Sequence, residues 1–235
     1  LVGGLGRSGD DGGGMYDQEA CAKGLATLVE ILEGDGCGGD GEASSIAALA
    51  KAGGTSVLGD LLYRPSLPAQ MERAVCVVLS TIAGHADDAT RNLFVSHELI
   101  DRFVQILEER EHFEVLSLAA AALANLSADV PSKTAGAIVR AGGVEALVGI
   151  LRRISGAAVL SDMSARTGQW SAAALCNLCR QGQEAAVAVA QCDGIAAIHA
   201  CLEDAGDDAG TMHQFLCGAL CNLATIDGEA LLFTQ

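Results

Sequence analysis

Residues 141–151 read AGGVEALVGIL, and three further stretches of the chain follow the same pattern. They are AGGTSVLGDLL (52–62), HELIDRFVQIL (97–107) and CDGIAAIHACL (192–202). Each of the four ends in Leu and has a bulky apolar residue four positions earlier, so both side chains lie on one face of a helix. Three of the four have Gly at the third position, where it ends one helix and allows the next to begin at a sharp angle.

A second pattern follows each copy of the first. Its copies are RAVCVVLSTIAG (73–84), LAAAALANLSA (118–128), SAAALCNLCRQ (171–181) and FLCGALCNLAT (215–225), and a weaker copy, GLATLVEILEG (24–34), precedes them. One column holds Glu30, Thr81, Asn125, Asn177 and Asn222, which are 51, 44, 52 and 45 residues apart. We interpret the longer steps as loop-like insertions, GDGCGGDG (34–41) and ISGAAVLSDMSARTG (154–168). A helical period in the low-to-mid forties predicts an all-α fold, the α-solenoid.

Each repeat is expected to contain three helices, for example at about 132–141, 143–154 and 165–180. One such unit cannot bury its apolar face alone, so neighbouring units must stack into a continuous core. The predicted organisation is a flexible Gly/Asp-rich leader at 1–16 followed by an array at 17–235. The array comprises the third helix of a partial repeat at 17–33, repeats at about 42–84, 85–129, 130–181 and 182–227, and the start of a further repeat at 228–235.

The charge of the chain limits its partners. The 235 residues include 14 basic and 30 acidic side chains, a formal net charge of −16. A negative net charge of this size repels the phosphate backbones of nucleic acids, so nucleic acid is not expected as a partner. A basic protein segment is expected instead. Many of the acids form short runs between apolar blocks, which is also the pattern of solvated loops.

Nine cysteines, most of them inside apolar helical stretches, predict a reducing, intracellular location in the cytoplasm or nucleus. Cys176 and Cys179 form a C-x-x-C pair, but the βαβ context of a redox motif and the further ligands of a zinc site are missing. We therefore expect packing roles for this pair and for Cys217 and Cys221. No metal or cofactor is expected, and no apolar run has the length of a transmembrane segment.

The two patterns together resemble those of the armadillo repeat family. The A-G-G turn before a helix ending in L-x-x-x-L, and the third helix with A-L-x-N-L, are carried in four copies between residues 17 and 235. HEAT repeats are the neighbouring alternative, but they have two helices and lack the Asn column. The resemblance implies a right-handed superhelix whose third helices line a concave groove.

In such a groove, the resemblance implies that the Asn column holds an extended peptide, because a carboxamide both donates and accepts hydrogen bonds. The implied groove residues are Thr81, Asn125, Gln169, Trp170, Asn177, Gln214, Phe215 and Asn222. Two alternatives stay open. The Asn side chains could instead cap helices or form hydrogen bonds between helices, and Trp170 could belong to the core.

The sequence favours a non-catalytic scaffold that binds an extended or helical protein segment. A regulatory or targeting fragment of a larger multidomain protein is the first alternative, and a nuclear-transport-type adaptor for basic cargo is the second. Importin-type arrays carry Trp four residues before the Asn, whereas this chain has Ala, Val or Gly there, which weakens the adaptor reading. The scattered His residues and carboxylates form no consistent catalytic set, so we do not expect an enzyme.

Overall fold

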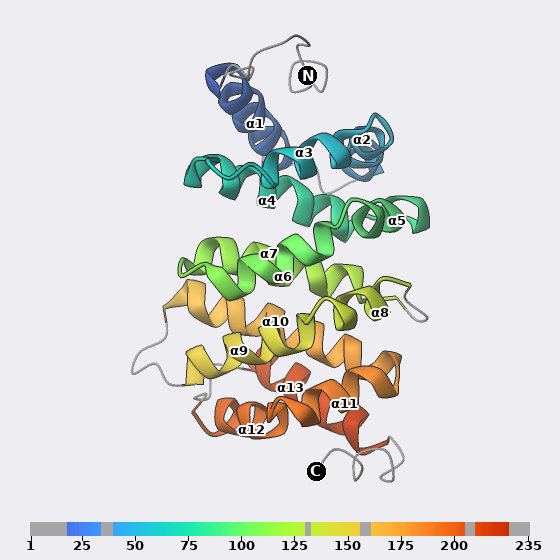
Figure 1. Cartoon of the computed structure of the whole chain (residues 1–235), viewed down its shortest axis with the longest axis vertical. Helices are drawn as coiled ribbons and strands as arrows, with labels where there is room; N and C mark the ends of the chain where they lie inside the picture. The colour runs from blue at the N-terminus through green and yellow to red at the C-terminus, as the bar shows by residue number, and fades with distance from the viewer. Residues whose placement is uncertain (1–17, 34–39, 130–132, 156–160, 205–209, 226–235) are drawn as a thin grey trace. The chain divides into compact units, whose positions relative to one another are not determined.

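The computed structural model describes residues 18–33, 40–129, 133–155, 161–204 and 210–225, and all regular secondary structure in these ranges is α-helical (Figure 1). The predicted leader at 1–16 and the predicted start of a further repeat at 228–235 lie outside the described residues. The helices are α1 (Gln18–Glu33), α2 (Asp40–Lys51), α3 (Gly54–Leu62), α4 (Ala69–Gly84), α5 (Asp88–Ser96), α6 (Leu99–Glu109), α7 (Phe113–Leu126), α8 (Lys133–Arg140), α9 (Gly143–Ser155), α10 (Asp162–Gln181), α11 (Gln183–Gln191), α12 (Gly194–Asp204) and α13 (Gly210–Ala224).

The chain divides into two compact units, Leu1–Leu99 and Ile100–Gln235. The first unit contains a repeat formed by α2, α3 and α4, preceded by α1, which packs on α4. The second unit contains two complete repeats, α8–α9–α10 and α11–α12–α13, together with α7 and nearly all of α6. The predicted three-helix period is thus present in both units.

The turn between the first and second helix of each repeat has a common geometry. The chain bends by 70° between α8 and α9 and by 76° between α11 and α12. In each turn, one residue adopts the left-handed backbone conformation. That residue is Gly142 (φ 81°) or Asp193 (φ 52°), which stands directly before the third-position glycine of the pattern. The third-position glycine is needed for close approach instead, because a Cβ on Gly143 would lie 2.8 Å from the carbonyl oxygen of Ile138.

The apolar columns of the first pattern form the core. Phe103, Leu147 and Ile198, four residues before the terminal Leu of their segments, are completely buried, and Leu58 is nearly so. Leu62, Leu107 and Leu151 at the segment ends are buried as well, whereas Leu202 is only half-buried. The spacing of four therefore marks the buried face, as the sequence predicts.

The stretch 154–168 differs from the prediction of a loop-like insertion. Helix α9 continues to Ser155, and α10 already begins at Asp162, so more than half of the stretch is helical. The start of α10 is capped by Ser161, whose side-chain oxygen accepts a hydrogen bond of 3.1 Å from the backbone N–H of Ser164. Such a cap satisfies an otherwise unpaired N–H and favours an earlier helix start.

Side chains of α9 connect neighbouring repeats of the second unit. The guanidinium of Arg153 donates to the backbone oxygens of Arg110 (3.1 Å) and Glu111 (3.3 Å), which follow α6. Its Cζ also lies 5.5 Å from the ring centroid of Phe113, a cation–π distance. These contacts hold α9 against the preceding repeat.

Within the described ranges, no single helix combines the length and apolar character that crossing a membrane requires. Two pairs of consecutive helices, α8 with α9 and α11 with α12, reach the required length and apolar character only when the two helices of a pair are taken together, and each pair is sharply bent.

Candidate functional site

The Asn column is carried by the three third helices of the second unit, α7, α10 and α13. Helix α10 packs against α7 on one side and α13 on the other. Asn125, Asn177 and Asn222 are each half-buried, one on each of these helices. We call this set of three side chains the Asn row.

Two members of the Asn row make the same hydrogen bond. Asn177 Nδ2 donates to the backbone oxygen of Ala124 at 3.1 Å, and Asn222 Nδ2 donates to that of Cys176 at 3.0 Å. Each acceptor stands one residue before the Asn of the preceding repeat. The side-chain amide therefore connects one third helix to the previous one, which is the inter-helix role that the sequence left open.

This bond leaves hydrogen-bonding capacity on each carboxamide. An Asn side chain carries two N–H donors and an acceptor oxygen with two lone pairs. The inter-helix bond uses one N–H, and in Asn177 the Oδ1 atom also lies 3.5 Å from a guanidinium nitrogen of Arg180. The structural role and a ligand-binding role are thus compatible on one side chain.

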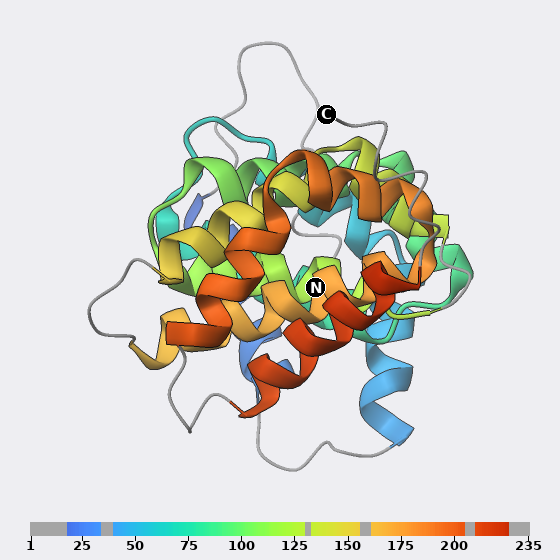
Figure 2. The same ribbon diagram turned by 90° about the horizontal axis from the view of Figure 1, so that it is seen from below.

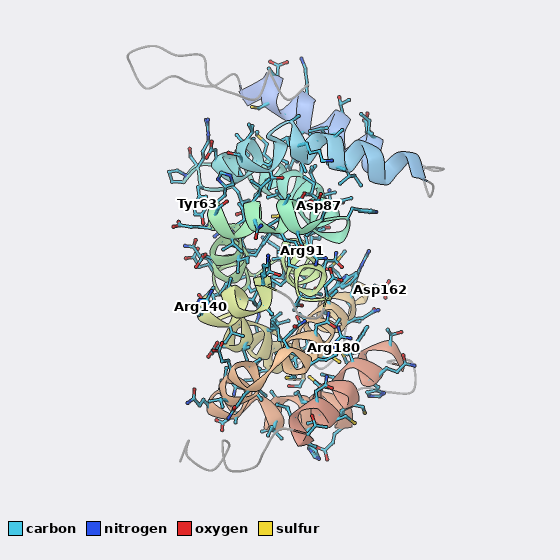
Figure 3. All side chains as sticks on the ribbon, turned by 90° about the vertical axis from the view of Figure 1, so that its right-hand side faces the viewer. Tyr63, Asp87, Arg91, Arg140, Asp162 and Arg180 are labelled. Atoms are coloured by element: carbon cyan, nitrogen blue, oxygen red, sulfur yellow. The ribbon has the colours of Figure 1, made fainter. Side chains whose placement is uncertain are left out.

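Two residues at the C-terminal end of α10 make three more contacts that the sequence analysis missed. Arg180 donates to the backbone oxygen of Ala128 at 2.7 Å, and Gln181 donates to those of Ser127 (3.1 Å) and Asp129. These acceptors lie at the end of α7, where helix carbonyls lack intrahelical partners. Arg180 (Figure 3) also places a positive charge beside Asn177.

The other expected groove residues lie on the same helices. Gln169 and Trp170 are half-buried on α10, eight and seven residues before Asn177. Phe215 is half-buried and Gln214 exposed at the equivalent positions of α13. The partial exposure of Trp170 means that its ring belongs neither wholly to the core nor wholly to the surface.

Thr81 differs from the other members of the column. It lies on α4 in the first unit, and its hydroxyl donates to the backbone oxygen of Val77 in its own helix at 2.9 Å. A threonine side chain has a single O–H donor. Because that donor is used within α4, Thr81 does not reproduce the bond made by Asn177 and Asn222.

Small residues stand next to the Asn row, and a half-buried thiol lies beside them. Four residues before the Asn stand Ala121, Ala173 and Gly218. A Cβ on Gly218 would lie 2.9 Å from Cys176 Sγ, so the absence of a side chain there makes room for this thiol. Burial raises the pKa of the Cys176 thiol, against an opposing effect of Arg180.

The cysteines do not form a reactive centre in the described residues. Burial, with the neighbouring Cys176, raises the pKa of Cys179 to about 12, which keeps this thiol protonated. No group of three His, Cys, Asp or Glu side chains in the described part of the chain could hold a metal ion. The expected packing role is wrong for Cys217 and Cys221, which are exposed on α13.

The comparisons with known proteins concern the fold. No protein-family model matches the sequence, and a search of curated proteins finds no match. An engineered protein of solved structure is similar, with a TM-score of 0.72 and 28% identity over 92% of this chain and 78% of the other. A designed armadillo repeat protein in complex with the peptide (KR)4 gives a TM-score of 0.73 at 19% identity, covering 97% of this chain and 82% of the other.

A computationally designed armadillo repeat protein for modular peptide recognition gives a TM-score of 0.71 at 20% identity, covering 99% of this chain and 84% of the other. The three-helix period and the all-helical core of the described residues are consistent with these likenesses. The chain is an all-α solenoid with an armadillo-like repeat fold.

Proposed function

We propose that the chain is a non-catalytic scaffold that binds an extended or helical protein segment along the Asn row. The observation that carries the proposal is the repeated geometry of Asn177 and Asn222. Each donates one N–H to the preceding helix and keeps part of its hydrogen-bonding capacity for a ligand. Asn177 keeps its second N–H and one lone pair of Oδ1 beside the Arg180 contact, and Asn222 keeps its Oδ1, while its Nδ2 also lies 3.8 Å from Cys176 Sγ. Side chains fixed in this way lose little conformational entropy on binding.

The designed armadillo repeat proteins support this proposal by analogy of fold. One was solved with the peptide (KR)4, and others were designed for modular peptide recognition. Each carboxamide clasp on a peptide backbone contributes on the order of 1 kcal/mol net, so several must act together. A row of equivalent side chains at a regular spacing meets that requirement.

Charged side chains stand at the ends of the third helices. Glu114 and Asp162 lie in the first turns of α7 and α10, whereas Arg180 lies in the last turn of α10 (Figure 3). The net charge of −16 supports a basic partner over an acidic one.

A peptide-display selection tests the proposal. It is run on the unmodified chain, on the double variant Asn177→Ala/Asn222→Ala, and on Arg153→Ala. The last variant also removes side-chain-to-carbonyl bonds between repeats, but from α9 rather than from the Asn row, so it controls for lost stability.

We expect peptides to be enriched on the unmodified chain and on Arg153→Ala, and to be lost on the folded double variant. Circular dichroism establishes that each variant keeps its helices. If the double variant selects the same peptides, or if no protein selects any, the Asn row serves only to connect the helices.

We also infer that the protein works in a reducing, intracellular compartment. None of the eight cysteines in the described residues forms a disulfide. Oxidising compartments favour disulfides, whereas the cytosol and nucleus keep thiols reduced. Alkylation of freshly lysed cells followed by mass spectrometry tests this inference, and an oxidised pair among these cysteines would contradict it.

A further inference from the structure

The third helices of the second unit do not share the acidic character of the chain. Helices α7, α10 and α13 together contain two acids and two arginines, so their charges cancel, although the whole chain carries −16. These residues are Glu114, Asp162, Arg166 and Arg180. Helix α13, which is red in Figure 2 and packs on α10 (light orange), has no Asp, Glu, Lys or Arg.

The charges of α10 are unevenly placed with respect to the Asn row. Asp162 precedes Asn177 by 15 residues, whereas Arg180 follows it by 3, about one helical turn. A guanidinium nitrogen of Arg180 lies 3.5 Å from Asn177 Oδ1. Burial raises the pKa of the Cys176 thiol, and the charge of Arg180 opposes that rise. The positive charge of Arg180 therefore acts within the surface that carries the Asn row.

The guanidinium of Arg180 is anchored but not neutralised. Its Nη2 atom donates to the backbone oxygen of Ala128 at 2.7 Å and makes the long contact with Asn177. A guanidinium has five N–H donors, and those of Nε and Nη1 take no part in these two contacts. Among the described residues, no carboxylate forms an ion pair with Arg180. The side chain is exposed, so a ligand can reach these remaining donors.

A purely structural role does not require a charge at this position. The next residue, Gln181, makes the same kind of bond to the end of α7 with an uncharged amide. The positions equivalent to Arg180 in the neighbouring repeats are Ala128 and Thr225, which are both uncharged. A basic residue in the last turn also suits the helix dipole, yet α7 and α13 end without one.

We propose that Arg180 binds the carboxylate of an Asp or Glu side chain in the protein segment held by the Asn row. A planar guanidinium matches the geometry of a carboxylate and forms strong, charge-assisted hydrogen bonds with it. A residue held by Asn177 lies about one helical turn from Arg180, a distance that an acidic side chain spans. The inference rests on the proposed function and adds the chemistry of one partner residue.

One acidic residue is compatible with a partner that is basic overall. The net charge of −16 acts on the whole segment during its approach, whereas Arg180 acts at contact on a single side chain. A mainly basic segment with one acid at the position next to Arg180 satisfies both conditions.

Selection from a random peptide-display library tests the inference on four proteins: the unmodified chain, Arg180→Gln, Arg180→Glu and Arg140→Glu. Gln at position 180 keeps an N–H donor for the backbone oxygen of Ala128 but removes the charge. Arg140 is exposed on α8, a first helix, so its substitution makes the same charge change away from the third helices. Figure 3 labels both arginines. Circular dichroism establishes that each variant keeps its helices.

We expect an acidic residue at one fixed position of the peptides selected by the unmodified chain and by Arg140→Glu. Arg180→Gln should show no charge preference at that position, and Arg180→Glu should select a basic residue there. A side chain that only connects two helices would not reverse the preference.

Two kinds of failure are distinguishable. If the peptides depend on Asn177 and Asn222 but have no acidic position, or if Arg180→Glu selects the same acid, this inference is overturned and the proposed function stands. If none of the proteins selects peptides, the proposed function fails and the inference fails with it.

Fluorescence anisotropy with one enriched peptide measures the size of the effect. Replacing its acidic residue by the corresponding amide should weaken binding to the unmodified chain about tenfold and leave binding to Arg180→Gln unchanged. Amidation of the C-terminus of the peptide should leave the affinity unchanged. A loss on amidation, without a loss on replacing the acidic side chain, would assign Arg180 to a terminal carboxylate and overturn the inference.

Discussion

At the residue scale, a substitution of Leu147 tests whether the repeats are aligned correctly, because the alignment places this residue in the core. Its side chain is completely buried on α9. Leu147→Ala is expected to lower the free energy of unfolding by about 2–5 kcal/mol, because it removes buried methyl groups and leaves a cavity. Denaturant titration measures this loss. Glu145→Ala, at an exposed position of the same helix, should change it by less than about 0.5 kcal/mol.

The thiols give a second prediction at this scale. The pKa of Cys179 is raised to about 12, so near neutral pH its reactive thiolate is scarce, and the side chain is buried as well. Cys217 and Cys221 are exposed on α13. We expect iodoacetamide to modify Cys217 and Cys221 first, with Cys179 reacting only when the protein unfolds. Peptide mass spectrometry over time measures the order, and early labelling of Cys179 would contradict it.

At the scale of the element, replacing each of two glycines of α9 by alanine is expected to change the stability in opposite directions. A Cβ at Gly143 would lie 2.5 Å from Ile138 Cγ2 and 2.8 Å from the Ile138 backbone oxygen, whereas a Cβ at Gly149 meets nothing within 4 Å. Gly143→Ala should destabilise by about 1–3 kcal/mol, because the clash involves backbone.

Gly149→Ala should stabilise by about 0.5–1 kcal/mol, because glycine inside a helix costs conformational entropy. Thermal unfolding of the two variants side by side is the measurement. If both shift in the same direction, the close turn between α8 and α9 is not as described.

At the scale of the whole molecule, the net charge of −16 governs association. If the proposed partner segment is basic, its affinity should fall steeply as salt is added, since mobile ions screen exposed charges beyond about 10 Å at 0.1 M ionic strength. Fluorescence anisotropy with a labelled (Lys-Arg) repeat peptide at low and high salt measures this dependence. An unchanged dissociation constant would mean that backbone contacts, rather than charge, hold the peptide.

The sequence by itself determined the helical repeat and its buried columns. Leu147 and Leu151 could be assigned to the core because a spacing of four on a helix is a local property, set by 3.6 residues per turn. The same local rules placed the turn before Gly143 and the helix that contains Asn177. Four copies of both patterns made the fold evident without any solved relative.

Only the tertiary structure decided what the repeated side chains contact. The bond from Asn177 to Ala124 joins residues 53 positions apart, and it exists because α10 packs on α7. Cys217 is exposed although Ala172, at the same position of the pattern, is buried. Equivalent residues have the same local structure but different neighbours, and in a solenoid the burial of a side chain depends on the helices that pack against its own helix.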